Sequence, residues 1–327
     1  MKKLQNFIRR NLTIVLAYAL VVFMVVLVSL LRPGFGSLTH LRSLAIEASV
    51  IGIVALGQTL VIITGGIDLS IPWVLNSAAI LMTVFTQGEN ERMIWAIPVV
   101  LLLAGLIGLT NGLAIAYLNI PPVIMTLAMN GILLGIMAGV ASGGLRIGYE
   151  RGAPPPVILG LARSPILGLP AVVWIWVGFS IIATLILSFG VLGRRLYAVG
   201  NNASASHFSG INVQAVRVTV YVLSALMSAI AGMILAGKFG RAYLGMGEAF
   251  LFGSVAAVVI GGASILGGRG HYLGTIAGAL ILTVLTALLP IFKLPAAAQN
   301  IIYGLVVLIT VYISNLSRGP SQEAPGM

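Results

Sequence analysis

The sequence predicts an all-α polytopic membrane protein with about ten transmembrane helices. Hydrophobic residues make up 59% of its 327 residues and charged residues only 8%, whereas a soluble domain is about 25% charged. Uncharged apolar stretches recur along the whole chain, and a spanning helix needs roughly 20 such residues. We therefore expect the lipid bilayer to cover most of the apolar surface.

The apolar stretches define the expected helices in order. The first follows a basic N-terminal segment, the second ends where Gly65 and Gly66 interrupt the apolar run, and the third has Pro72 in its first turn, a position that proline favours. The expected ranges are 12–31, 43–64, 69–86, 93–117, 122–142, 170–190, 217–237, 249–267, 271–290 and 296–316.

Charge predicts the orientation of the first helix. Lys2, Lys3, Arg9 and Arg10 precede it, which places the N-terminus in the cytoplasm by the positive-inside rule. An even number of spans then places the C-terminus there too. The other basic residues do not decide the matter, because this topology divides the 18 Lys and Arg equally between the two sides.

Two connections are long, and neither is large enough to be a soluble domain. Residues 143–169 contain two adjacent glycines and three adjacent prolines, and fall outside the membrane on the external side. Residues 191–216 fall on the cytoplasmic side. We therefore expect residues 1–327 to form a single transmembrane domain.

The spacing of the helices suggests an internal repeat. Helices two to five occupy about 43–142 and helices seven to ten about 217–316, with one helix between the two blocks. A single intervening helix makes the blocks cross the bilayer in opposite directions, which is the layout of inverted-repeat transporters. The residue-level similarity between the blocks is weak.

Asp68 is the only aspartate in the chain, and it lies between two apolar stretches. An ionised carboxylate inside a membrane costs several kcal/mol unless it is paired or hydrated, so such a residue is a candidate functional residue. A second interpretation is that Asp68 caps the following helix by accepting from free N–H groups within Leu69–Pro72, where Pro72 itself has none. The two interpretations are compatible.

Other polar residues lie inside the expected spans. They can bond neighbouring helices or contact a polar cargo, and an amide suits sugar hydroxyls because it is both donor and acceptor. Thr59 and Thr126 belong to this polar set, and the candidates for a pathway are Gln58, Thr64, Asp68, Ser70, Asn76, Asn111 and Asn130.

Several function classes are excluded by composition. The chain has no cysteine, and its three histidines are not at metal-ligand spacing, so no metal site or cofactor is expected. No catalytic acid–base pair or nucleophile–base set can be assembled, and no phosphate-binding loop of the GxxxxGK[ST] type is present. The net charge of +11 is scattered at the ends of apolar runs, which indicates membrane flanks rather than nucleic-acid binding.

Four segments resemble a known family. They are LGQTLVIITGGIDLS at 56–70, IPPVIMTL at 120–127, GRRLYAVGNN at 193–202 with SGINV at 209–213, and AAVVIGG at 256–262 with GGRG at 267–270. In this order and spacing they resemble the inner-membrane permease subunit of ribose-type sugar ABC importers, over about residues 45–315. The resemblance implies a type II ABC importer-like fold and a multi-pass protein of the bacterial inner membrane.

The resemblance also implies partners. Such permeases form pairs, are powered by a cytoplasmic ATPase and receive sugar from a periplasmic binding protein. In the family a short helix of the cytoplasmic loop docks into the ATPase. Here that element maps to 202–210 within the loop at about 191–216, and we expect Asn202 to be its N-cap. The candidate coupling residues are Asn202, Ala203, Ser204, Ala205 and Gly210.

The chain departs from the family pattern at three places. Ala203 replaces an acidic residue, Leu134 stands where an arginine is common, and Leu251-Phe252-Gly253 replaces a Glu-Leu-Asp stretch. These losses leave open whether the pair is a homodimer or a heterodimer with a sibling permease. Two alternatives to a sugar permease also stay open, namely a related permease for branched-chain amino acids or nucleosides and a proton-coupled secondary transporter.

Overall fold

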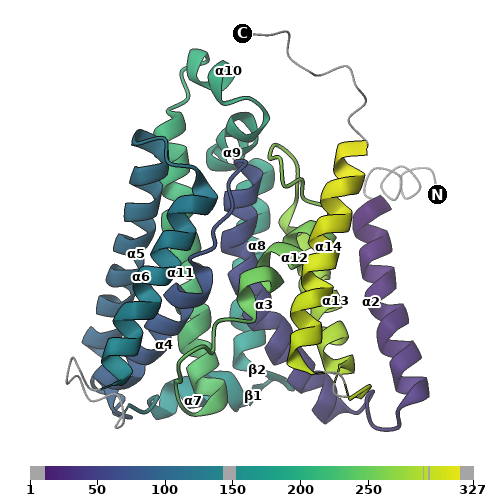
Figure 1. Ribbon diagram of the computed structural model, residues 1–327. Coiled ribbons are helices and arrows are strands. Elements are labelled where there is room, and N and C mark those ends of the chain that lie inside the picture. Colours follow the sequence, from purple (N-terminus) through teal and green to yellow (C-terminus); the bar gives the residue numbers. More distant parts are fainter. Residues whose placement is uncertain (1–11, 143–151, 290, 294, 317–327) are drawn as a thin grey trace.

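The computed structural model describes residues 12–142, 152–289, 291–293 and 295–316. These residues form a bundle of long helices with 13 helices in all and one two-stranded hairpin (Figure 1). The elements are α2 (Leu12–Leu31), α3 (Leu38–Ile63), α4 (Ile71–Thr86), α5 (Met93–Tyr117), α6 (Pro122–Ala141), α7 (Pro156–Arg163), β1 (Pro165–Ile166), β2 (Leu169–Pro170), α8 (Ala171–Phe189), α9 (Val191–Asn201), α10 (Ala203–Phe208), α11 (Val213–Phe239), α12 (Phe250–Ile260), α13 (Tyr272–Leu288) and α14 (Ala296–Leu316).

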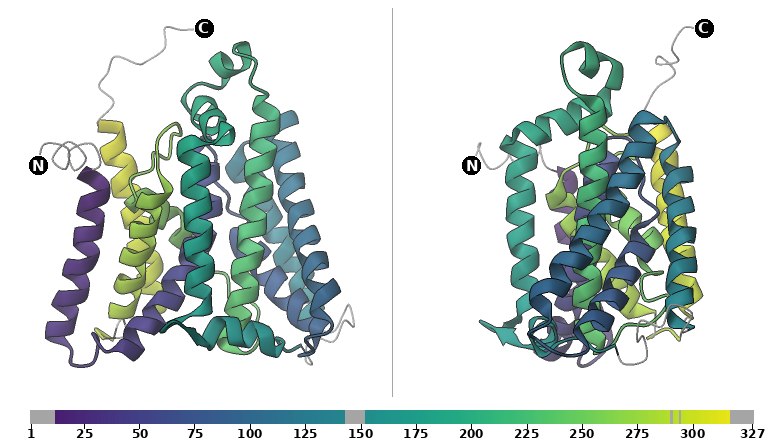
Figure 2. Two further views of the ribbon diagram at one scale, coloured as in Figure 1. Left: turned by 180° about the vertical axis from the view of Figure 1, so that it is seen from behind. Right: turned by 90° about the vertical axis from the view of Figure 1, so that its left-hand side faces the viewer.

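The long helices run up and down a common axis, so the bundle has two ends. The short helices α9 and α10 lie at one of them, which we call the α10 end, and α7 lies at the other, the α7 end (Figures 1 and 2). The start of α2 and the finish of α14 both lie toward the α10 end. Helix α3 runs toward this end and α11 runs away from it, so the blocks α3–α6 and α11–α14 cross the bundle in opposite directions.

The helices have the length and composition of membrane spans. Five of them, α3, α5, α6, α8 and α11, are long and apolar enough to cross a bilayer. Large apolar side chains on α2, such as Leu16, Val22 and Phe23, are exposed, which a soluble bundle would avoid. The protein is therefore a helical membrane protein, as the composition predicts.

Some predicted boundaries were wrong. Helix α3 begins at Leu38 rather than at 43, because Ser37 caps it by accepting from the N–H of His40 (3.3 Å). The predicted helix 249–267 ends at Ile260, since Gly261 and Gly262 turn the chain and Gly262 has a φ of 87°.

The long connection predicted at 143–169 is also more structured than expected. It contains α7 and the hairpin of β1 and β2, in which Pro165 pairs with Pro170. The paired glycines of this connection lie outside the described residues, as do the four basic residues before α2.

Helix α11 forms the centre of the bundle and packs against α3, α4 and α5. Glycines make this possible, because each contact leaves no room for a side chain. A Cβ on Gly57 would lie 2.7 Å from the Cα of Ser224, and one on Gly112 would lie 2.7 Å from the Cα of Val218. Close backbone approach of this kind is the main source of helix association in lipid, where the hydrophobic effect is absent.

A second close contact joins α12 to α13. The Gly274–Gly278 pair, a small-xxx-small motif, lies against the backbone of Gly261 and Ala257. The motif therefore packs within the chain.

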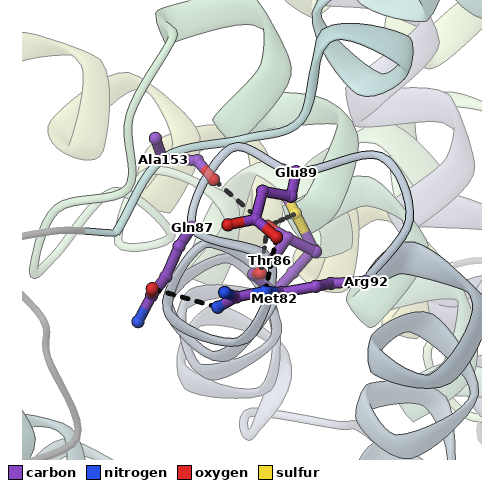
Figure 3. Close-up of polar contacts among 6 residues, drawn as sticks. All are labelled: Met82, Thr86, Gln87, Glu89, Arg92 and Ala153. Atoms are coloured by element: carbon purple, nitrogen blue, oxygen red, sulfur yellow. Dashed lines mark hydrogen bonds and ion pairs between the residues drawn. The ribbon is translucent and has the colours of Figure 1, made fainter.

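Polar contacts fasten the α7 end (Figure 3). Thr86, at the end of α4, donates to the carbonyls of Met82 (2.7 Å) and Ala153 (3.1 Å). Arg92 pairs with Glu89 (2.7 Å) and donates to Gln87 (3.0 Å). These contacts fix the turn between α4 and α5 against the segment that leads into α7.

The close packing of α11 gives a stability prediction. In Gly232→Ala the new methyl group would overlap the carbonyl of Leu75 on α4, so we expect a loss of about 1–3 kcal/mol from overpacking. Thermal unfolding of the purified protein in detergent measures this. The matched control is Gly178→Ala on α8, where nothing lies within 4 Å. Equal melting temperatures for the two variants would contradict the packing argument.

Candidate functional site

The most unusual backbone of the bundle is the segment 64–70 between α3 and α4, which we call the first break. It leaves α3 near the α10 end and descends as non-helical chain toward α4 (Figure 1). Gly65 supports the turn out of α3 with a φ of 81°. Non-helical backbone at membrane depth must have its polar groups bonded by surrounding protein, so the neighbours of this segment identify the candidate site.

Asp68 organises the first break. Its Oδ1 accepts from the N–H (2.9 Å) and the hydroxyl (2.6 Å) of Ser70, and its Oδ2 accepts from the hydroxyl of Ser224 on α11 (2.7 Å). The side chain is 1% exposed. Ser70 rather than Asp68 is the N-cap of α4. Of the N–H groups in the capping interpretation, the Asp68 carboxylate bonds only that of Ser70, and it also reaches across to another helix.

Two further helices bond the first break. The Asn111 amide on α5 donates to the Ser70 hydroxyl (3.0 Å), and the Thr126 hydroxyl on α6 accepts from the N–H of Leu69 (3.0 Å). Three helices therefore converge on three consecutive residues, Asp68, Leu69 and Ser70. Asn111 Oδ1 is buried and has no partner in the described structure.

The structure gathers only some of the predicted pathway residues. Asp68, Ser70 and Asn111 form one connected group, and Thr64 lies at the start of the same break with its hydroxyl bonded to Val61 (2.8 Å). The other three do not join this network of hydrogen bonds. They are Gln58, whose buried amide has no partner among the described residues, Asn76, which donates to the carbonyl of Tyr243 (2.8 Å), and Asn130, which is half-buried on α6.

Sequence reasoning missed Ser224 as a member of this group. The available signal was the pair Ser224 and Ser228, spaced by four residues within the apolar run of α11. Such spacing puts both hydroxyls on one face of a helix. A serine in a span usually bonds its own helix, as Ser228 does with the carbonyl of Ser224 (2.9 Å), so the contact with Asp68 could not be read from spacing alone.

A second non-helical segment, residues 261–271 between α12 and α13, meets the first. We call it the second break. The N–H of Gly268 donates to the carbonyl of Ile63, the last residue of α3 (2.9 Å). Gly267 packs directly against Gly65: a Cβ on Gly267 would lie 2.9 Å from the backbone N of Gly65. The two breaks are thus joined through their backbones.

Helix α9 seals this junction. Gly200 packs against both Ile63 and Gly268, and a Cβ there would overlap the carbonyl of Ile63. The Tyr197 hydroxyl donates to the carbonyl of Gly270 (2.7 Å), and burial raises the pKa of this phenol above its ordinary value, so the donor stays protonated at neutral pH. One helix therefore contacts the end of α3, where the first break begins, and the second break.

Helix α10 projects beyond the bundle, next to α9 (Figure 1). The predicted cap is confirmed, because the Asn202 side chain accepts from the N–H of Ala205 (2.9 Å). Gly210 takes a φ of 81° and has nothing within 4 Å of where a Cβ would lie. The residue that sequence reasoning missed here is Phe208, an aromatic side chain that is 89% exposed at the tip of the helix.

Two cavities lie at opposite ends of the bundle. The larger has a volume of about 420 Å³ and lies at the α7 end among α3, α11, α12, α13 and α14, where Glu47, Tyr243, Gln299 and Tyr303 line it. Glu47 forms an ion pair with Lys238 across this region. The smaller has a volume of about 210 Å³ and lies at the α10 end beside the first break. In the described residues, no group of three or more metal-ligating side chains occurs.

Comparison with known proteins identifies the family. Residues 41–311 match the family described as "Branched-chain amino acid transport system / permease component". The chain belongs to this permease family. The match covers both breaks, α9 and α10. No solved structure matches the chain.

Several curated relatives are similar to this permease over most of its length. The ribose import permease protein of Haemophilus influenzae is 32% identical over 91% of this chain and 92% of its own. The ribose import permease protein of Escherichia coli strain K12 is 33% identical over 89% and 90%. The autoinducer 2 import system permease protein of Shigella flexneri is 31% identical over 97% and 90%.

The network at Asp68 predicts a difference between two substitutions. Asp68→Leu leaves three buried donors on Ser70 and Ser224 without an acceptor, at a cost of about 1–3 kcal/mol each. Asp68→Asn keeps an oxygen for Ser70 and can donate its amide N–H to the Ser224 oxygen. We therefore expect the melting temperature of the permease in detergent to fall much further for Asp68→Leu than for Asp68→Asn. Equal losses in the two variants would mean that the charge itself, rather than the hydrogen bonds, holds the break.

Proposed function

We propose that this permease is the translocation subunit of an ABC importer for a monosaccharide or a related small polar solute. The observation that carries the proposal is the similarity to ribose import permeases over about nine-tenths of both chains. The family description names branched-chain amino acids, but these relatives carry the names of a sugar and of autoinducer 2, which favours the sugar class. Selectivity would rest largely on a separate periplasmic binding protein.

In this proposal the α10 end faces the cytoplasm of a bacterium and the α7 end faces the periplasm. Ten helices would span the inner membrane as α2, α3, α4, α5, α6, α8, α11, α12, α13 and α14. The whole chain would form one permease domain, and its blocks α3–α6 and α11–α14 would be an inverted repeat. The opposite directions of the two blocks and the common end of α2 and α14 support this arrangement (Figure 1).

ATP would be hydrolysed on a separate ATPase that docks at α10, within the cytoplasmic loop of about 191–216. The exposed ring of Phe208 gives this short helix an apolar anchor, and aromatic anchors in pockets commonly dominate protein interfaces. The docked helix continues through Asn202 into α9. Gly200 and Tyr197 of α9 contact the end of α3 and the second break. A displacement of α10 would therefore reach the start of the segment that holds Asp68.

The pathway itself would run between two permease subunits. Helices α6 and α14 both lie on the front face of the bundle in Figure 1. Many of their large apolar side chains are exposed, including Ile124, Leu127 and Ile132 on α6 and Ile301 and Leu308 on α14. Of the candidate residues, Asn130 on α6 is the one whose helix lies on this face. The partner would be a second copy or a sibling permease.

A proton-coupled secondary transporter is the alternative from another class. It requires a titratable group in the membrane interior, and Asp68 is the main candidate. Its two oxygens already accept three hydrogen bonds, which favours a fixed structural carboxylate. If Asp68 carried protons, Asp68→Asn would stop uptake as completely as Asp68→Leu, whereas our proposal expects Asn to retain uptake.

Reconstitution tests the proposal directly. The permease, its ATPase and its binding protein in proteoliposomes should take up D-ribose only with ATP. Phe208→Ser should reduce co-purification of the ATPase about tenfold or more, as loss of a central aromatic anchor does at other interfaces. The matched control is Leu167→Ser at the α7 end, which removes a side chain that is 87% exposed. Uptake by the permease alone under a proton gradient would refute the proposal.

The pair can be tested by mass. Native mass spectrometry of the ATP-hydrolysing complex in mild detergent should show two permease subunits, because the exposed faces of α6 and α14 form only one side of a pathway. Two permease subunits of equal mass would indicate a homodimer, and two subunits of different mass would indicate a heterodimer. One permease subunit for each active complex would refute the pair.

A further inference from the structure

The cavity at the α10 end has the groups of an anion site. It has a volume of about 210 Å³ and lies where the first break, the connection between α5 and α6, and the start of α11 meet. Its polar lining includes Asn119, Arg217 and Tyr221. No acidic residue lines it. A cavity of this size can hold a phosphate or carboxylate group together with a few water molecules.

Two donors in the cavity have no partner. Arg217 is half-buried and forms no ion pair or hydrogen bond with any described residue. Tyr221 is 1% exposed, and its buried hydroxyl also lacks a partner. The Tyr221 hydroxyl lies against Gly66, because a Cβ on Gly66 would overlap it. The hydroxyl therefore points at the part of the first break that lines the cavity. Most buried polar groups are bonded, and an orphan of this kind requires an explanation.

The start of α6 borders the cavity. Pro122 is the first residue of this 20-residue helix, and Pro121 and Pro122 both line the cavity. Neither proline has a backbone N–H, so these two residues add no hydrogen-bond donor. The positive end of the helix dipole lies on this side of the cavity and favours an anion.

No carboxylate is among the residues that line the cavity. Asp68 lies outside the lining, and both of its oxygens accept from Ser70 and Ser224. The cavity therefore presents a guanidinium, a phenol, an amide and the positive end of a helix dipole. A neutral sugar would need acceptors as well as donors, and the lining offers few. Oxyanions accept only, which matches this set.

We propose that this cavity binds a small oxyanion, namely a phosphate group that is either free, part of a phosphate monoester or part of a lipid headgroup. Arg217 binds it through charge-assisted hydrogen bonds, and the Tyr221 hydroxyl donates a second bond. The ligand would touch both the first break and the start of α6, so its binding would fix these two segments relative to each other.

Calorimetric titration of the purified permease with inorganic phosphate, in a chloride buffer, tests the proposal without the ATPase or binding protein. Its outcome is thus independent of the proposed transport function. We expect saturable binding with one site. Arg217→Gln should weaken it by about tenfold or more, because a charge-assisted bond is lost, and Tyr221→Phe by a smaller factor. The matched control, Arg195→Gln, removes an exposed arginine at the same end and should bind as the parent does.

Further arms distinguish the sources of the phosphate group. Competition by ribose 5-phosphate would support a soluble monoester. Loss of phosphate binding in nanodiscs of phosphatidylglycerol, but not of phosphatidylcholine, would support a lipid headgroup. Melting temperatures report whether each variant is folded. Three outcomes would overturn the proposal. The first is that the parent binds neither phosphate nor ribose 5-phosphate, in detergent or in phosphatidylcholine nanodiscs. The second is that folded Arg217→Gln binds phosphate like the parent, and the third is that D-ribose displaces phosphate as well as ribose 5-phosphate does.

Discussion

The need to bond peptide groups inside an apolar bundle shapes this permease more than any other constraint. The first break leaves the helical path while still surrounded by α5, α6 and α11, so its polar groups require partners from those helices. Asn111, Thr126 and Ser224 supply them, one from each helix. Asp68, the only aspartate of the chain, accepts two donors of the break, both on Ser70, and one donor from α11.

Glycine is the second requirement, since these side-chain bonds are short and demand closely packed helices. Gly57 lets α3 approach α11 at Ser224, and Gly112 lets α5 approach the same helix at Val218. With these positions filled by methyl groups, the helices would separate and the short bonds to the break would lengthen. The hydrogen bonds of the first break therefore depend on the same close helix packing that the glycines permit.

Much of the fold could be predicted from the sequence, but the site only in part. Apolar length defines a span well, and the break at Gly65 and Gly66, the isolated Asp68 and the cap at Asn202 all follow from local rules. The end of α12 at Ile260 was missed because apolar residues continue past the glycines that stop the helix. Ser224 and Tyr221 were missed because their roles depend on contacts with residues more than 150 positions away, which no periodicity encodes.

The junction of Gly200 with Ile63 and Gly268 has a consequence for how such a protein can diversify. Contact there is made by main-chain atoms, so the fit of α9 against the end of α3 and the second break is independent of which side chains α10 exposes. In the proposed function, residues that contact the ATPase, such as Phe208, would then be able to change while this backbone contact keeps its geometry. Partner binding and transmission would lie on two adjacent helices, and a sibling subunit could keep one while altering the other.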